Sequence, residues 1–219
     1  MFIGHFAVAL GAKRAVPSVS LGVLFLACQL ADLIWPTLLL LGLEIVEIDP
    51  GNTAFTPLNF VSYSYSHSLV GLAVWSTLTG GVYAIAGRRG LTTAAAVALV
   101  GISHWLLDLI THRPDLPLTF SGPTRVGWGL WNSVPATIAV EVPMFVAGAM
   151  IYSRSTRAND RLGSIGFWAL TAFLLLVYAA NSLSPAPPGP TAVAIAAQSM
   201  WLLVAWGFWV DRHREKVVG

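Results

Sequence analysis

The chain has 219 residues, of which 56% are hydrophobic and only 10% carry a charge. Soluble domains carry about 25% charged residues, so this composition excludes an ordinary soluble protein and indicates an integral membrane protein. The net charge of +2 follows from basic residues in the loops and gives no indication of nucleic-acid binding.

The apolar stretches, taken in chain order, predict one short helix and six long ones. Residues 2–11 are too short to cross a hydrocarbon core of about 30 Å, so we expect a half-helix that dips into the membrane. The six stretches long enough to span are residues 17–41, 67–86, 91–111, 134–152, 163–180 and 191–210. The sequence therefore predicts an all-α, polytopic membrane helix bundle, a single domain over residues 1–219 with a metal-site core in 1–145 and additional helices in 146–219.

The basic residues lie in alternate loops, and this pattern predicts the orientation of the chain. Ten of the twelve fall on one side of the predicted helices: Lys13, Arg14, Arg88, Arg89, Arg154, Arg157, Arg161, Arg212, Arg214 and Lys216. Cytoplasmic loops of membrane proteins carry the excess of lysine and arginine, so we expect this side and both chain ends in the cytoplasm. The single cysteine, Cys28, excludes an intramolecular disulfide and a thiolate-rich metal cluster.

Histidines and acids lie within or beside these apolar segments. His104, Asp108 and His112 are spaced four residues apart, which places them on one face of a helix with 3.6 residues per turn. Such side chains are costly in hydrocarbon, and imidazole and carboxylate groups are typical ligands of zinc. The spacing therefore predicts a site for a divalent metal, most simply zinc.

The depth of other polar residues along their helices brings them to the same level. Asp32, His104 and Glu141 lie about 10–15 Å below the outer ends of their predicted spans, at about 1.5 Å per residue. We expect a metal site that opens to the extracytoplasmic side or to the outer leaflet. Its predicted ligands are His5, Asp32, His67, His104, Asp108, His112 and Glu141.

Four short motifs carry a resemblance to a known family. They are His5 before an apolar, glycine-containing stretch, Ala31-Asp32, Ser66-His67-Ser68, and His104 to Asp108 followed by Thr111. In these the chain resembles the YdjM-like bacterial inner-membrane proteins, described as membrane-bound metal-dependent hydrolases, over about its first 120 residues. The resemblance implies a bacterial inner-membrane enzyme that hydrolyses an ester or phosphoester bond of a lipid or lipid-linked substrate.

The order of the ligand residues is similar, more distantly, to that of the zinc-dependent phospholipase C and S1/P1 nuclease group. This resemblance implies one to three zinc ions: one held by Asp32, His67, His104 and Asp108, a second near His5, and another served by His112 and Glu141. Metals in such sites lower the pKa of a bound water. Asp32, His67 and Asp108 are the expected catalytic residues, and Arg113 and Arg125 are expected to bind a substrate phosphate.

Other interpretations stay open at this point. A lone histidine in a membrane helix is often a packing residue, which applies to His5, and Glu141 could bond a neighbouring helix. His112 could lie at the membrane interface, and His67 with its flanking serines could form the polar start of a helix. A metal-ion or proton-coupled transporter would also bury histidines and acids, although it usually has broken helices in repeated halves. No internal repeat is evident in the sequence, and the hydrolase is the function that it favours.

Overall fold

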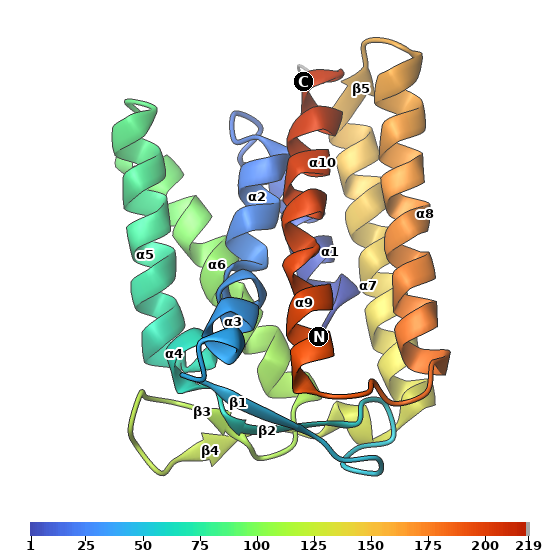
Figure 1. Cartoon of the computed structure of the whole chain (residues 1–219). Helices are drawn as coiled ribbons and strands as arrows, with labels where there is room; N and C mark the ends of the chain where they lie inside the picture. Colours follow the sequence, from blue (N-terminus) through green and yellow to red (C-terminus); the bar gives the residue numbers. More distant parts are fainter. Residues whose placement is uncertain (218–219) are drawn as a thin grey trace.

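The computed structural model describes residues 1–217 and is built almost entirely of helices (Figure 1). Within these residues, five helical segments are long and apolar enough to cross a membrane. They are α5 (Leu69–Ala86), α6 (Leu91–Thr111), α7 (Val134–Ser155), α8 (Arg161–Leu183), and α9 (Pro190–Gln198) with α10 (Met200–Arg212) as one span. A sixth span consists of α2 (Leu21–Cys28) and α3 (Leu30–Leu40). The prediction of an all-α, multi-pass membrane helix bundle is confirmed.

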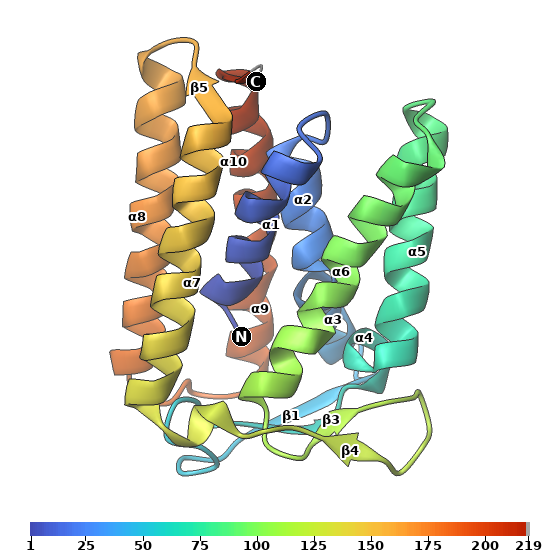
Figure 2. The same ribbon diagram turned by 180° about the vertical axis from the view of Figure 1, so that it is seen from behind.

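The first helix, α1 (Ile3–Ala15), is the predicted half-helix. It begins inside the bundle and runs toward the end at which the C-terminus lies (Figures 1 and 2). Its 13 residues reach only about 20 Å, less than the thickness of a hydrocarbon core. Met1 is buried and the start of the chain lies within the bundle (Figure 2), whereas the charge pattern predicts both chain ends in the cytoplasm.

The predicted continuous helix over residues 17–41 is in fact two helices, which meet at an angle of 55°. The break is at Gln29, whose φ and ψ of −105° and 11° are not helical. The carbonyl group just before it, that of Cys28, accepts a hydrogen bond from His104 Nδ1 at 2.8 Å. In an unbroken helix that carbonyl would accept from the amide of Asp32 instead, so the bond across to α6 accompanies the break.

Short strands and loops gather at the two ends of the bundle. One end, called here the hairpin end, holds the antiparallel pair β1 (Ile45–Ile48) and β2 (Leu58–Ser62), α4 (Ser64–His67), β3 (Leu116–Pro117), β4 (Arg125–Val126) and the 3₁₀ turn η1 (Leu130–Asn132). The other, called the basic end, holds the α5–α6 turn with Arg88 and Arg89, and the pair β5 (Thr156–Ala158) and β6 (Arg214–Lys216) (Figure 1). The loops that were predicted to share one side of the membrane therefore lie at one end of the molecule.

A single apolar core joins α1 to the helices around it. Phe6 of α1 packs edge-on against Phe25 of α2, with ring centroids 4.8 Å apart, and Phe145 of α7 is fully buried beside them. A Cβ atom on Gly148 of α7 would lie 2.5 Å from the carbonyl oxygen of Ala7, so only glycine permits this approach of α1 to α7. This packing fixes the position of the first turn of α1, which carries His5.

Candidate metal centre

Five of the predicted ligands meet in one buried cluster, although they come from four different helices. His5 lies on the first turn of α1, Asp32 on the first turn of α3, His67 at the end of α4, and His104 and Asp108 on the last turns of α6. Nitrogen and oxygen atoms of two sets lie within 4.8 Å of one another: His5 with His104 and Asp108, and Asp32 with His67 and His104. Either set has the donor types and proximity that a divalent metal ion requires.

The two carboxylates stand between the imidazole rings. His5 Nε2 is 3.2 Å from Asp108 Oδ1 and His104 Nε2 is 3.1 Å from Asp108 Oδ2. On the other side, His67 Nε2 lies 3.2 Å from Asp32 Oδ1. The Asp32 side chain is 26% exposed while that of Asp108 is 3% exposed, so the cluster is reached from the side of Asp32.

Hydrogen bonds outside the cluster decide which nitrogen of His104 carries a hydrogen. Its Nδ1 lies 2.8 Å from the carbonyl oxygen of Cys28, and a carbonyl can only accept. Nδ1 therefore donates, and in the neutral ring Nε2 presents a lone pair toward Asp108 and Asp32. Nε2 has no hydrogen-bond partner among the described residues, because neither carboxylate lies in a hydrogen-bonding direction from it.

Hydrogen bonds outside the cluster also place the hydrogen of His67 on Nδ1. The hydroxyl of Ser66 donates to the carboxylate of Glu44 at 2.6 Å, so its oxygen accepts from His67 Nδ1 at 2.7 Å. The neutral ring of His67 then also presents its Nε2 lone pair toward a carboxylate, that of Asp32. A lone pair facing an anionic oxygen at about 3 Å is repulsive unless a proton or a metal ion lies between them.

Positive charge is already placed at one point of the cluster. The ammonium group of Met1 donates to Asp108 Oδ1 at 2.6 Å, and both groups are buried. Glu141 lies beside this contact, where its Oε2 accepts from the backbone amides of Phe2 and Gly4 at 3.0 and 3.3 Å. The structure thus places Glu141 at the start of α1 and outside both ligand sets, and its Oε1 has no partner among the described residues.

His112 lies at the border of the cluster. The sequence placed it on the same helical face as His104, but α6 ends at Thr111 and His112 has extended backbone angles. Its Nε2 is nevertheless 4.0 Å from Asp108 Oδ2, while its Nδ1 bonds Asp115 Oδ1 at 3.0 Å. It belongs to neither of the two ligand sets.

Asp115 and Tyr63 form a polar group on the outer side of His112. Burial opposes ionisation of Asp115, but the hydrogen bonds of His112 and Arg113 outweigh it and hold the pKa of this carboxyl below its usual value. Burial, together with the charge of Asp115, raises the pKa of Tyr63 well above its usual value, so the phenol keeps its proton and donates to Asp115 at 3.1 Å. His112 is therefore oriented by a fixed carboxylate, as metal-binding histidines commonly are.

The two arginines predicted to bind a substrate phosphate lie in the loops of the hairpin end. Arg113 donates to Asp115 at 3.1 Å and to Asn59 at 2.7 Å, and its side chain is 37% exposed. Arg125 is exposed in β4 and donates to the carbonyl oxygen of Gly122 at 3.4 Å. Neither guanidinium forms an ion pair with Asp32 or Asp108.

No family model, curated protein or solved structure matches this chain. The resemblance to YdjM-like hydrolases therefore stays a prediction that rests on the motif residues.

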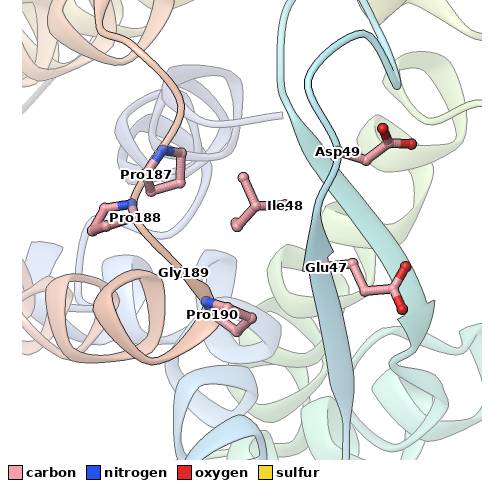
Figure 3. Close-up of a pocket in the computed structure, with 7 residues that line it drawn as sticks. All are labelled: Glu47, Ile48, Asp49, Pro187, Pro188, Gly189 and Pro190. Atoms are coloured by element: carbon pink, nitrogen blue, oxygen red, sulfur yellow. The ribbon is translucent and has the colours of Figure 1, made fainter.

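A separate pocket on the hairpin end contains none of these ligands (Figure 3). It lies between β1 and the loop of Pro187, Pro188, Gly189 and Pro190. Ile48 points toward the prolines, whereas the carboxylates of Glu47 and Asp49 point away from them, as alternation along a strand requires (Figure 3). Glu47 and Asp49 line the pocket together with Ile48 and the prolines, so it combines polar and apolar surface and lies apart from the histidine cluster.

Two of the residues that orient the cluster carry no recognisable sequence signal. Glu44 follows α3 in an irregular segment, and nothing in the Ser66-His67-Ser68 motif points to it. Asp115 lies between two prolines, where a loop-capping acid is the ordinary expectation. Both reach their histidines through loops, so no helical spacing relates them.

Proposed function

We propose that this chain is a membrane-embedded, metal-dependent hydrolase that acts on an ester or phosphoester of a lipid or lipid-linked substrate. The observation that carries the proposal is the arrangement of His67 and His104, whose Nδ1 atoms are engaged outside the cluster and whose Nε2 atoms face the carboxylates of Asp32 and Asp108. A divalent cation between Asp32, His67 and His104 would satisfy the atoms of one ligand set together. Zinc suits such a combination of imidazole and carboxylate donors.

The number of ions is limited by His104. Both ligand sets include this residue, but only its Nε2 is free, because Nδ1 is bonded to Cys28. One ion can therefore use His104, and a second would depend on Asp108 as a bridge to His5. A metal here would supply Lewis acidity, stabilising charge on a phosphoryl or carbonyl oxygen and lowering the pKa of water.

Asp32 is the side chain best suited to act on water. It is the most exposed member of the cluster, and it lies beside two histidines. In the proposed reaction the oxygen of water bonds to the phosphorus or carbonyl carbon, and the bond to the leaving alcohol oxygen breaks. Asp32 accepts the proton of the water and returns it to the alcohol, which is the role of a general base and then acid.

A lipid substrate follows from where the cluster lies. Its ligands sit on helices that meet below the hairpin end, within the apolar length of α6. We propose that the hairpin end faces the extracytoplasmic side of a bacterial inner membrane, since the basic end holds ten of the twelve basic residues. A headgroup of the outer leaflet would then reach Asp32 without leaving the membrane.

A transporter remains the second candidate, because the break at Gln29 is a feature of transporter helices. Two observations favour the hydrolase. The core of Phe6, Phe25 and Phe145 is apolar. Lys13 at the basic end of α1 is also engaged, donating to Asp211 at 2.7 Å and to the carbonyl oxygen of Val19 at 2.8 Å. A transporter needs a polar path through the bundle, and that path would have to cross the apolar core and displace the contacts of Lys13.

Metal analysis of the detergent-purified protein tests the proposal. We expect near-stoichiometric zinc, manganese or iron in the parent and its loss in the double variant His104→Ala, Asp108→Ala. The control is His213→Ala, which removes a histidine that bonds Asp160 at the basic end, far from the cluster. The metal-loaded parent should release phosphate or fatty acid from phospholipid in mixed micelles at a rate the double variant lacks.

Two results would speak against the hydrolase. A parent that binds no metal after exposure to zinc would remove the basis of the proposal. A parent that binds metal, hydrolyses no lipid ester or phosphoester, and moves zinc or protons across the membrane of proteoliposomes would be a transporter.

A further inference from the structure

Glu44 is a buried acid with no cation beside it. It lies between α3 and β1, is 2% exposed, and forms no ion pair within the described residues. Its carboxylate instead takes two hydrogen bonds from one residue: the amide of Ser66 donates to Oε1 at 2.9 Å and the hydroxyl of Ser66 donates to Oε2 at 2.6 Å. Burying a charge in this way costs free energy, so its position calls for a reason.

The reason is at the other side of the Ser66 hydroxyl. That oxygen lies 2.7 Å from His67 Nδ1. The hydroxyl has only one hydrogen, and its other near neighbour, the carbonyl oxygen of Tyr63 at 3.4 Å, is also an acceptor. Whichever of the two takes the hydrogen, the serine oxygen is left to accept from His67.

We infer that Glu44 is a positioning residue, which acts through Ser66 to fix His67 as the Nδ1–H tautomer and to turn its Nε2 lone pair toward Asp32. The role in metal binding rests on the proposed function, whereas the tautomer does not. Partners of this kind set the orientation and basicity of metal-binding histidines, and their loss typically weakens metal affinity about 10–100-fold.

Replacing Glu44 by glutamine reverses the chain of hydrogen bonds with little change of shape. The amide of Ser66 needs an acceptor and takes the glutamine oxygen, so the glutamine NH₂ group faces the serine hydroxyl and donates to it. The serine hydrogen is then free to point to His67 Nδ1. His67 would carry its hydrogen on Nε2, directed at Asp32, where it blocks a metal.

Removing the hydroxyl should cancel this reversal. In Ser66→Ala, Nδ1 of His67 loses its partner and neither tautomer is imposed. We therefore expect Ser66→Ala to lose less zinc affinity than Glu44→Gln. In the double variant Glu44→Gln, Ser66→Ala there is no hydroxyl to turn. The double variant should therefore bind zinc better than Glu44→Gln alone.

The experiment uses the full chain in detergent and two readouts. Histidine-selective ¹⁵N labelling gives the tautomer of each of the five histidines in metal-free protein, and the His67→Asn spectrum assigns the His67 signals. Competition with a zinc-binding dye gives the affinity. The matched control is Glu47→Gln, an exposed acid of β1 that bonds Asn59 at 3.1 Å.

We expect parent and Glu47→Gln to show His67 with its hydrogen on Nδ1, and Glu44→Gln to show it on Nε2 with zinc affinity lower by about 10–100-fold. A parent-like tautomer in Glu44→Gln would overturn the inference. So would a double variant whose fold-loss of zinc affinity equals the product of the losses in the two single variants. If Glu44→Gln does not fold, an unchanged His67 tautomer in Ser66→Ala overturns it equally. A parent with the expected tautomers that binds no zinc would reject the metal site and leave the role of Glu44 intact.

Discussion

His112 depends on a carboxylate that is itself held by three partners. Asp115 accepts from His112, Tyr63 and Arg113, and the phenyl and indole rings of Phe60 and Trp131 enclose the imidazole at centroid distances of 5.0 and 4.5 Å. The aromatic rings shield the His112 imidazole from water, and its hydrogen bond to Asp115 compensates for that burial. His112 is therefore rigid even though it lies just beyond the end of α6.

This arrangement predicts how stability depends on pH. The folded pKa of Asp115 lies below its unfolded value, so its stabilisation is present above a pH of about 4 and is lost as the pH falls through the lowered pKa. The melting temperature of Asp115→Asn in detergent should lie a few degrees below that of the parent near neutral pH. The difference should shrink below a pH of about 4.

Asp49→Asn is the matched control, because Asp49 lies at the same end and makes no side-chain hydrogen bond or ion pair among the described residues. Its melting temperature should follow that of the parent at every pH. A deficit of Asp115→Asn that widens toward acid would contradict the assignment.

Helical spacing predicts which residues of one helix lie close together. It does not predict which nitrogen of a histidine faces the cluster. His104 and Asp108 are close because they are one turn apart, which the sequence alone indicates. The tautomer of His104 depends on the carbonyl of Cys28, and that of His67 depends on Glu44, and both partners arrive from other segments. The sequence therefore indicated much of the cluster's composition, while its hydrogen-bond directions come only from the fold.

At the scale of elements, α1 is a short helix held at both ends. Glu141 of α7 accepts from the amides of Phe2 and Gly4, which a free helix start would leave unpaired. At the other end Lys13 donates to Asp211 of α10, which also accepts from Tyr152 at 3.0 Å. These bonds keep His5 at the depth of Asp108.

Gly148→Ala should separate α1 from α7. The added methyl group would meet the backbone of Ala7 at 2.5 Å, and overpacking of this kind costs about 1–3 kcal/mol. Denaturation in detergent should show that loss, and metal analysis should show lower zinc occupancy because His5 is displaced.

Gly81→Ala is the control, since a Cβ there meets nothing within 4 Å and alanine favours a helix. It should leave zinc occupancy unchanged and stability equal or slightly higher. If Gly148→Ala and the parent have equal stability and zinc content, the close contact of α1 and α7 is needed neither for stability nor for metal binding.

The bend between α2 and α3 shows where prediction from hydropathy ends. Residues 17–41 are apolar throughout most of their length, so a window of about 20 residues detects one span and no break. The Gln29 side chain is buried and neither of its polar atoms has a partner among the described residues. A single glutamine does not change a window average, although it coincides with the 55° turn that directs Asp32 to the cluster.

At the scale of the whole molecule, the charge pattern and the fold agree on which loops share an end. Single cysteines at Gly90 in the α5–α6 turn and at Ala186 in the α8–α9 loop occupy exposed positions at opposite ends. The native Cys28 is buried and should not react. In intact bacterial cells, a membrane-impermeant maleimide should label Ala186→Cys and spare Gly90→Cys.

Permeabilised cells provide the control, because both cysteines should then react. Labelling of Gly90→Cys alone in intact cells would invert the proposed orientation. It would place the metal centre on the cytoplasmic side.

The burial of α1 against α7 also has a consequence for synthesis. Phe2 and Glu141, which join the two helices, are 139 positions apart in the chain. The contacts of α1 with α7 therefore cannot form until the fourth spanning helix has been made, although α2 can pack against α1 earlier. The five residues of the cluster all precede α7 in the chain, so α7 can fix the position of His5 only after every member of the cluster has been made.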